Sequence, residues 1–169
     1  MANPTYNLIA SQVVGSGGAS SVTFLSIPNT YTDLLIKISA RSNYNNNPEI
    51  AVLSFNGSSS SFTNKDIFGT GSSAVSQSNG ASGVFSEGNN WTTNTFGSSE
   101  FYIPNYTSSN YKSISAEGVS ENNGTGGYQE LNAVLWSNPA AITSIGISTQ
   151  NGTGWLQYST FYLYGIKNS

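Results

Sequence analysis

The chain contains no histidine and no cysteine, and only 8% of its 169 residues are charged. Without histidine and cysteine the usual zinc sites, haem ligands and iron–sulfur clusters are excluded. Disulfides, thiol nucleophiles and Ser-His-Asp or Cys-His catalytic groups are excluded as well. Five basic residues stand against eight acidic ones, which argues against electrostatic binding to nucleic acid or to an anionic membrane. The composition therefore favours a protein that is not an enzyme and carries no cofactor.

Long apolar segments are also missing. No segment approaches the ~20 apolar residues that a membrane-spanning helix needs, so we expect no membrane association. The first residues, Met-Ala-Asn-Pro, lack the basic and apolar regions of a secretory signal peptide. We therefore expect the protein to be made in the cytosol.

The residues that are present in excess are small and polar. Ser, Asn, Gly and Thr make up 84 of the 169 residues, a share that is also typical of disordered linkers. Disordered chains, however, are poor in aromatic and β-branched residues. This chain has eight Phe, ten Tyr and three Trp, and most of them lie within alternating apolar segments. The pattern predicts ordered strands separated by polar turns.

About eight well-marked strands are predicted from alternating side chains. In the clearest segment, 34–42, apolar residues alternate with Lys37, Ser39 and Arg41. The last segment, 159–166, is apolar on both faces, which predicts a central strand buried on both sides. No segment has the 3.6-residue period of a helix. The strand segments are 6–14, 21–27, 34–42, 50–55, 100–103, 112–119, 129–136, 142–148 and 159–166.

Two segments fall outside this regular pattern. Residues 1–6 are predicted to form an N-terminal arm. Residues 56–99 are rich in Ser, Gly and Asn with isolated aromatics, and we expect a loop-rich insertion there, with short strands and one functional or partner-ordered loop. The expected fold is one all-β domain over 1–169, an antiparallel β-sandwich, with the jelly roll as the preferred architecture.

Acidic residues are the first candidates for chemistry. Glycoside hydrolysis needs two carboxyl groups roughly 5–9.5 Å apart, and the acids in or near predicted strands are Glu100, Glu117, Glu121 and Glu130. With eight acids in the chain some pair will lie close by chance, so solubilising or edge-protecting charge is the simpler interpretation. A calcium ion near Asp66 or Glu87 is a minor alternative, because no complete EF-hand loop is present. We predict no catalytic residue and no metal ligand.

Aromatic residues in polar loops are the stronger candidates for binding. Sugar-binding sites stack aromatic faces on sugar rings, whereas protein interfaces are also enriched in Tyr and Trp. Packing at the ends of the sandwich is a third possibility. The sequence leaves these alternatives open. The candidate binding residues are Tyr44, Trp91, Tyr106, Tyr128 and Trp155.

Several short segments of the chain are distinctive when taken together. The segment 27–34, Ile-Pro-Asn-Thr-Tyr-Thr-Asp-Leu, leads into Ala-Arg-Ser at 40–42, and 161–167 reads Phe-Tyr-Leu-Tyr-Gly-Ile-Lys. Two further segments are Ser-Phe-Asn-Gly at 54–57 and Ile-Pro-Asn-Tyr at 103–106. Together these segments resemble small virion proteins of tailed bacteriophages, which serve as capsid decoration (cement) proteins, head fibres or tail-associated adhesion domains. The middle of the chain does not share the resemblance.

The resemblance implies a protein located in the virion and assembled in the host cytoplasm. Our first hypothesis is a homotrimeric cement protein that binds the major capsid protein, or another virion protein, and stabilises the outer face of the head shell. Residues 1–6 and 56–99 are the expected docking segments. The alternative is a tail fibre or receptor-binding adhesin that recognises a host-surface glycan. A polysaccharide depolymerase is a third possibility, which would require a converging pair of acids.

Overall fold

The computed structural model describes residues 5–78 and 82–167. Within these ranges the chain forms twelve strands, and none of the described segments is a helix that could cross a membrane. The prediction of an all-β chain is confirmed. The strands are β1 (Tyr6–Val13), β2 (Ser21–Phe24), β3 (Asp33–Ala40), β4 (Glu49–Phe55), β5 (Phe62–Gly69), β6 (Ala74–Gln77), β7 (Gly83–Ser86), β8 (Gly97–Ile103), β9 (Lys112–Glu121), β10 (Gly127–Trp136), β11 (Ile145–Thr149) and β12 (Thr160–Ile166).

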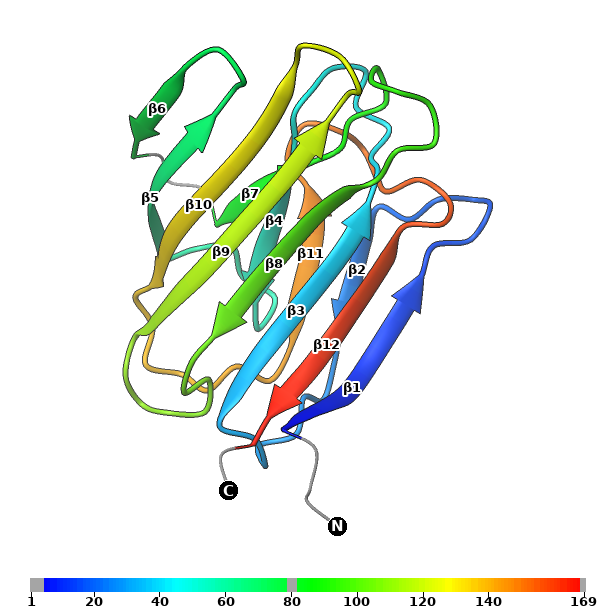
Figure 1. Cartoon of the computed structure of the whole chain (residues 1–169). Coiled ribbons are helices and arrows are strands. Elements are labelled where there is room, and N and C mark those ends of the chain that lie inside the picture. Colours follow the sequence, from blue (N-terminus) through cyan, green and yellow to red (C-terminus); the bar gives the residue numbers. More distant parts are fainter. Residues whose placement is uncertain (1–4, 79–81, 168–169) are drawn as a thin grey trace.

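The strands form two antiparallel sheets that pack face to face as a sandwich (Figure 1). The larger sheet has eight strands in the order β1-β12-β3-β8-β9-β10-β5-β6, and the smaller has four in the order β2-β11-β4-β7. In Figure 1 the larger sheet lies in front of the smaller one. The loops 14–20, 41–48, 87–96 and 150–159 all lie at one end of the sandwich, which we call the loop end.

Two hairpins, β5–β6 and β9–β10, widen the larger sheet. Without them the remaining strands lie in the orders β1-β12-β3-β8 and β2-β11-β4-β7. Successive strands of this set pass from one sheet to the other at β1–β2, β2–β3, β3–β4, β7–β8, β8–β11 and β11–β12. The sandwich is thus established, and the jelly roll stays our interpretation of this strand order.

One hydrophobic cluster extends between the sheets. Alternate residues of β3, among them Leu34, Ile36 and Ile38, point inward, as the sequence pattern predicts. At one end of the core, the rings of Phe55 and Trp136 meet edge to face with centroids 5.2 Å apart. Aromatic pairs in this arrangement add to the free energy gained from burial.

Two glycines set how closely other groups approach the larger sheet. A Cβ added at Gly118 in β9 would lie 2.4 Å from the carbonyl oxygen of Phe85, so only glycine lets β7 lie against the sheet there. A Cβ at Gly165 in β12 would lie 2.3 Å from the ring of Tyr31. Both glycines are therefore required for close packing.

Three sequence-based expectations need correction or qualification. The outer side of β12 is uncovered: Tyr162 and Tyr164 are half-buried there, so the prediction of burial on both sides is wrong. The segment 56–99 contains β5, β6, β7 and the first residues of β8, joined by loops. Most of the predicted arm 1–6 lies outside the described residues, while Tyr6 begins β1.

Candidate functional site

The larger sheet turns one face toward the smaller sheet and the other toward solvent, and we call the second the outer face. It carries seven of the ten exposed large hydrophobic side chains among the described residues. Isolated exposed apolar residues are ordinary, but a concentration on one face marks an interaction site. The seven are Tyr6, Leu8, Val13, Ile67, Tyr102, Val119 and Leu131.

The apolar residues of the outer face form two groups. The tyrosine patch, formed by Tyr6, Leu35, Tyr102, Tyr162 and Tyr164, lies over β1, β12, β3 and β8. Its Tyr162 and Tyr164 rings stack with centroids 6.3 Å apart. The cross-strand register places Leu35 between Tyr164 and Tyr102, which explains why this outward-facing leucine is only 8% exposed. The patch offers aromatic faces with hydroxyl groups, a combination typical of protein interfaces.

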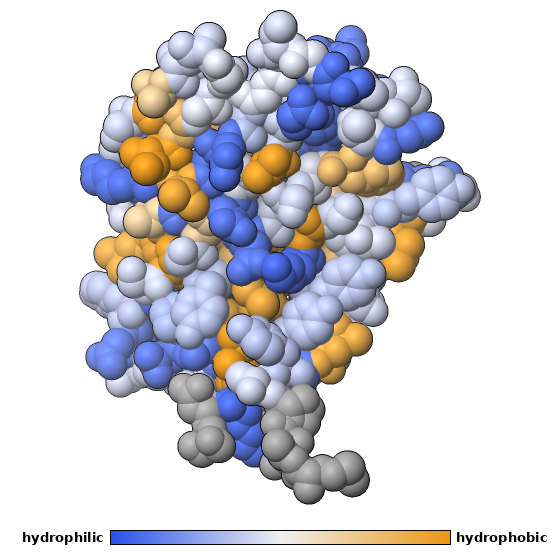
Figure 2. Space-filling view, in the orientation of Figure 1, coloured by the Kyte–Doolittle hydropathy of each residue, from blue (hydrophilic) through white to orange (hydrophobic). Residues whose placement is uncertain are grey.

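The aliphatic patch, formed by Ile67, Val119 and Leu131, lies over β5, β9 and β10. Ile67 and Leu131 are direct cross-strand partners, exposed by 56% and 55%. Figure 2 views the outer face and shows hydrophobic side chains gathered on its β5–β6–β10 side, with hydrophilic side chains across the middle. The two patches are therefore separated by a polar band.

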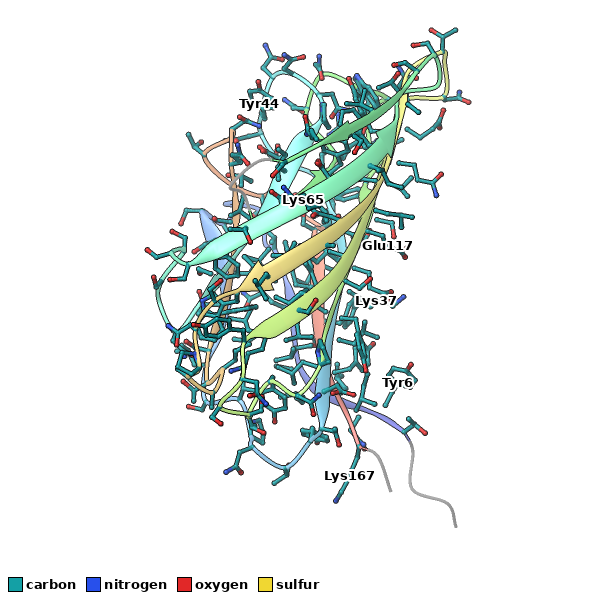
Figure 3. All side chains as sticks on the ribbon, turned by 90° about the vertical axis from the view of Figure 1, so that its left-hand side faces the viewer. Tyr6, Lys37, Tyr44, Lys65, Glu117 and Lys167 are labelled. Carbon is teal, nitrogen blue, oxygen red and sulfur yellow. The ribbon has the colours of Figure 1, made fainter. Side chains whose placement is uncertain are left out.

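Charges in this polar band nearly balance. Lys37 forms an ion pair with Glu100, and the hydrogen bond to Glu100 raises the pKa of Lys37. Glu100 lies directly opposite Glu117 on β9, and Lys65 projects from β5. Figure 3 shows Tyr6, Lys37 and Glu117 on the same side of the sheet. The face therefore presents no strong field of one sign.

The predicted acid candidates are distributed over three environments. Glu100 and Glu117 lie directly opposite each other on the outer face, where Glu100 lines an open hollow beside Lys37 and the tyrosine patch. Glu121 accepts a hydrogen bond from the backbone N–H of Asn123 at 2.9 Å, within the turn between β9 and β10. Glu130 points into the sandwich and is 3% exposed. None of these positions resembles an enclosed site where two carboxyl groups face a substrate.

Glu130 belongs to a buried polar cluster on the inner side of β5 and β10. Its Oε2 accepts the N–H of Phe85 at 2.8 Å, and its Oε1 accepts the amide of Asn132 at 3.3 Å. Asp66, also 3% exposed, lies directly opposite Asn132. Burial and the neighbouring Asp66 carboxyl together raise the pKa of Glu130 to about 7. This arrangement does not suit catalysis, since Glu130 and Asp66 are each only 3% exposed.

Two of the five predicted binding residues are buried. Tyr106 is 0% exposed and its hydroxyl donates to the carbonyl of Pro28, while burial raises its pKa. Trp155 is 1% exposed; its indole N–H donates to the carbonyl of Ile147 at 3.3 Å, and its ring packs on Phe161. A ligand cannot stack on either ring in the folded protein. For these two residues the packing interpretation applies and the sugar-stacking interpretation is wrong.

The other three predicted residues lie at the loop end and are half-buried. Trp91 stacks on Tyr128 with centroids 5.7 Å apart and planes 21° apart. Tyr128 in turn contacts Phe85 and Phe68. Tyr44 lies on the 41–48 loop, away from the outer face, as Figure 3 shows. The structure therefore brings Trp91 and Tyr128 together as one stack, and the sequence did not predict this pairing.

The loop end also contains a polar pocket of about 670 Å³. Segments 16–20, 89–96 and 153–158 contribute to its wall, together with Asn43 and the largely buried Arg41. Two of its residues, Arg41 and Tyr158, were not predicted as site residues. Arg41 lies at the end of a strand pattern and was interpreted as part of that strand, whereas Tyr158 lies just before the last predicted strand and was assigned no role.

The described part of the chain contains no clear metal-binding site. No group of three or more acidic residues lies close enough there to hold an ion. Glu87, one of the two calcium candidates, accepts hydrogen bonds from Ser120 at 2.7 Å and Thr95 at 3.2 Å and is 1% exposed. The other candidate, Asp66, belongs to the buried cluster with Glu130.

No family model matches the chain, and no curated protein and no solved structure matches it either.

Proposed function

We propose that this chain is a structural protein of a tailed-phage virion, a cement protein that binds the outer surface of the head shell through the outer face of its larger sheet. The observation that carries the proposal is the concentration of exposed apolar side chains on that face. A monomer that kept this face in solvent would expose both the tyrosine and the aliphatic patch. The short segments that resemble virion proteins support the same proposal.

The size of the outer face suits a stable protein interface. Eight strands at about 4.8 Å spacing span about 34 Å, and a strand of seven residues spans about 23 Å. The product is about 800 Å², which is the area that each partner buries in a standard interface. The face is therefore large enough to hold the protein on a shell without an additional domain.

The charges favour a protein partner. Lys37 and Lys65 are offset by Glu100 and Glu117 on the same face. A nucleic acid or an anionic membrane would require an excess of basic residues. A nearly neutral face with tyrosines and aliphatic residues instead matches the composition of interface cores. The proposed occupant is accordingly the outer surface of the major capsid protein.

Co-sedimentation with phage heads that lack the protein tests this proposal. Leu131→Glu places a charge in the aliphatic patch and is expected to weaken binding at least about tenfold. Leu25→Glu is the matched control, because Leu25 is 72% exposed and lies outside the outer face. Equal binding by the two variants contradicts the proposed docking face, and failure of the unmodified protein to sediment with heads contradicts the proposed function.

A second candidate function is recognition of a host-surface glycan, as in a tail adhesin. The Trp91–Tyr128 stack and the polar pocket, both at the loop end, favour it. The two functions use different surfaces, so one protein could perform both.

A further inference from the structure

We infer that the pocket at the loop end is a binding site for a neutral saccharide. This inference does not depend on docking to a shell, because the pocket lies outside the outer face. It follows from the chemistry of the pocket wall, from the way the wall is held in place, and from one exposed tyrosine at its rim.

The wall carries neutral polar side chains. Asn89, Asn94 and Gln157 contribute amides, and Thr93 contributes a hydroxyl. Amides and hydroxyls both donate and accept hydrogen bonds, as sugar hydroxyls do. No acidic residue lines the pocket, which disfavours a cation. An apolar ligand would leave these polar groups without partners, at a cost in free energy.

Arg41 is the one charged residue in the wall, and its guanidinium is hydrogen-bonded to the protein itself. Its two terminal nitrogens donate to the carbonyl oxygens of Asn89, Trp91, Thr92 and Thr95 at 2.8–3.1 Å. These four bonds hold the 89–95 loop in one conformation. The terminal N–H groups of the guanidinium are thereby used in fixing the wall, so a phosphate or a carboxylate would find none of them free to bind. Neutral sugars fit this wall better than anionic ones.

Other hydrogen bonds fix the opposite side of the pocket. The Asn43 amide donates to Thr153 Oγ1 at 2.7 Å and its carbonyl accepts the N–H of Thr153 at 2.8 Å. Trp155 and Ala19 exchange two backbone hydrogen bonds at 2.7 and 3.1 Å. The wall is thus built before any ligand arrives, which lowers the entropic cost of binding. A volume of about 670 Å³ lies within the usual range of ligand sites.

Tyr158 gives the pocket an aromatic rim. Its side chain is 68% exposed, and its backbone has φ = 72°, a conformation that is unfavourable for a bulky residue. Asn94, also in the pocket wall, has φ = 65°. Backbone strain of this kind is concentrated at ligand sites. The ring face of Tyr158 would stack against the C–H face of a sugar, while the amides bind its hydroxyls.

Saturation-transfer NMR with the purified protein tests the inference. The neutral probes are glucose, galactose, mannose and N-acetylglucosamine, with one trisaccharide of each. The anionic probes are sialyllactose and inorganic phosphate. We expect at least one neutral probe to bind. In amide correlation spectra of the protein, that probe should shift the backbone amides of residues 89–95 and 153–158. Tighter binding of a trisaccharide than of its monosaccharide would identify a polysaccharide as the ligand, and equal binding would identify a free sugar.

Tyr158→Ala is expected to weaken binding of that probe about tenfold, and Tyr158→Phe to retain it, because only the ring is needed. Tyr111→Ala is the matched control: Tyr111 is 60% exposed and lies on the loop between β8 and β9, at the opposite end of the sandwich. The inference is overturned if no neutral probe binds at 10 mM (roughly the weakest affinity of interest). It is also overturned if Tyr158→Ala binds like the unmodified protein, or if phosphate or sialyllactose binds more tightly than every neutral probe.

Discussion

Replacing Glu130 with glutamine should make the protein more stable at alkaline pH. Glu130 is buried against Asp66, and its pKa in the folded protein is raised to about 7 from an ordinary value of about 4.5. Glutamine has the same shape but no charge, and its oxygen can still accept the Phe85 N–H. Its amide can also donate to Asp66 Oδ1, which has no hydrogen-bond partner among the described residues. The variant removes the titration and keeps the Phe85 hydrogen bond, while it gives up the 3.3 Å bond from the Asn132 amide.

The sign of the effect follows from proton binding. Below about pH 4.5 both the folded and the unfolded chain hold the Glu130 proton, so this group does not affect stability. Between pH 4.5 and 7 the unfolded chain releases the proton while the folded one keeps it, and stability falls as the pH rises. Above pH 7 the penalty is constant. A pKa difference of 2.5 corresponds to about 3 kcal/mol.

Urea unfolding, followed by tryptophan fluorescence at pH 5, 6, 7 and 8, measures this effect. Glu130→Gln and the unmodified protein should have similar free energies of unfolding at pH 5 and differ by about 2–3 kcal/mol at pH 8, with the variant more stable. Glu117→Gln, on the exposed outer face, is the control and should follow the unmodified protein at every pH. If Glu130→Gln and the unmodified protein differ by the same amount at all four pH values, the raised pKa of the buried Glu130 is refuted.

Three further predictions concern packing and can be checked by thermal and urea denaturation. Arg41→Lys should destabilise the protein by about 2–3 kcal/mol, because one ammonium group cannot bond the four carbonyls of the 89–95 loop; stability equal to the unmodified protein would contradict this role. Phe55→Ala should cost about 3–5 kcal/mol through loss of the aromatic cluster with Trp136, and a loss below about 1 kcal/mol would show that the site collapses. Gly165→Ala should cost about 1–3 kcal/mol through its clash with the Tyr31 ring. Because Tyr31→Ala removes that ring, the double variant should lose less stability than the sum of the two single variants. A loss equal to that sum would contradict the clash.

The sequence predicted best those strands that have one apolar and one polar face. Strand β3 alternates inward Ile36 and Ile38 with outward Lys37, so its pattern is unambiguous. Strand β5 could not be recognised in this way, because its buried positions include the polar residues Asn64 and Asp66. Asp66 is buried beside Glu130, which is far away along the chain, and alternation within one segment cannot detect such a neighbour.

The binding residues were harder to predict for a related reason. Tyr106 and Trp155 lie in polar segments, yet the chain folds those segments back onto the core and buries the rings. Tyr162 and Tyr164 looked like core residues but lie on a face without a second layer. Local sequence determines which side of a strand a residue occupies, whereas the packing of distant strands determines whether that side is covered.

The most direct test of the proposed function is a cryo-electron microscopy reconstruction of a phage that encodes this sequence, together with the copy number of the protein in its particles. We predict copies across the head surface, in numbers that match its shell subunits, with the outer face of the eight-stranded sheet against the shell. Particles in which the protein is absent, or in which it occurs in only a few copies on the tail, would contradict the proposal. A head-bound protein with this face turned toward solvent would contradict the docking surface assigned to it.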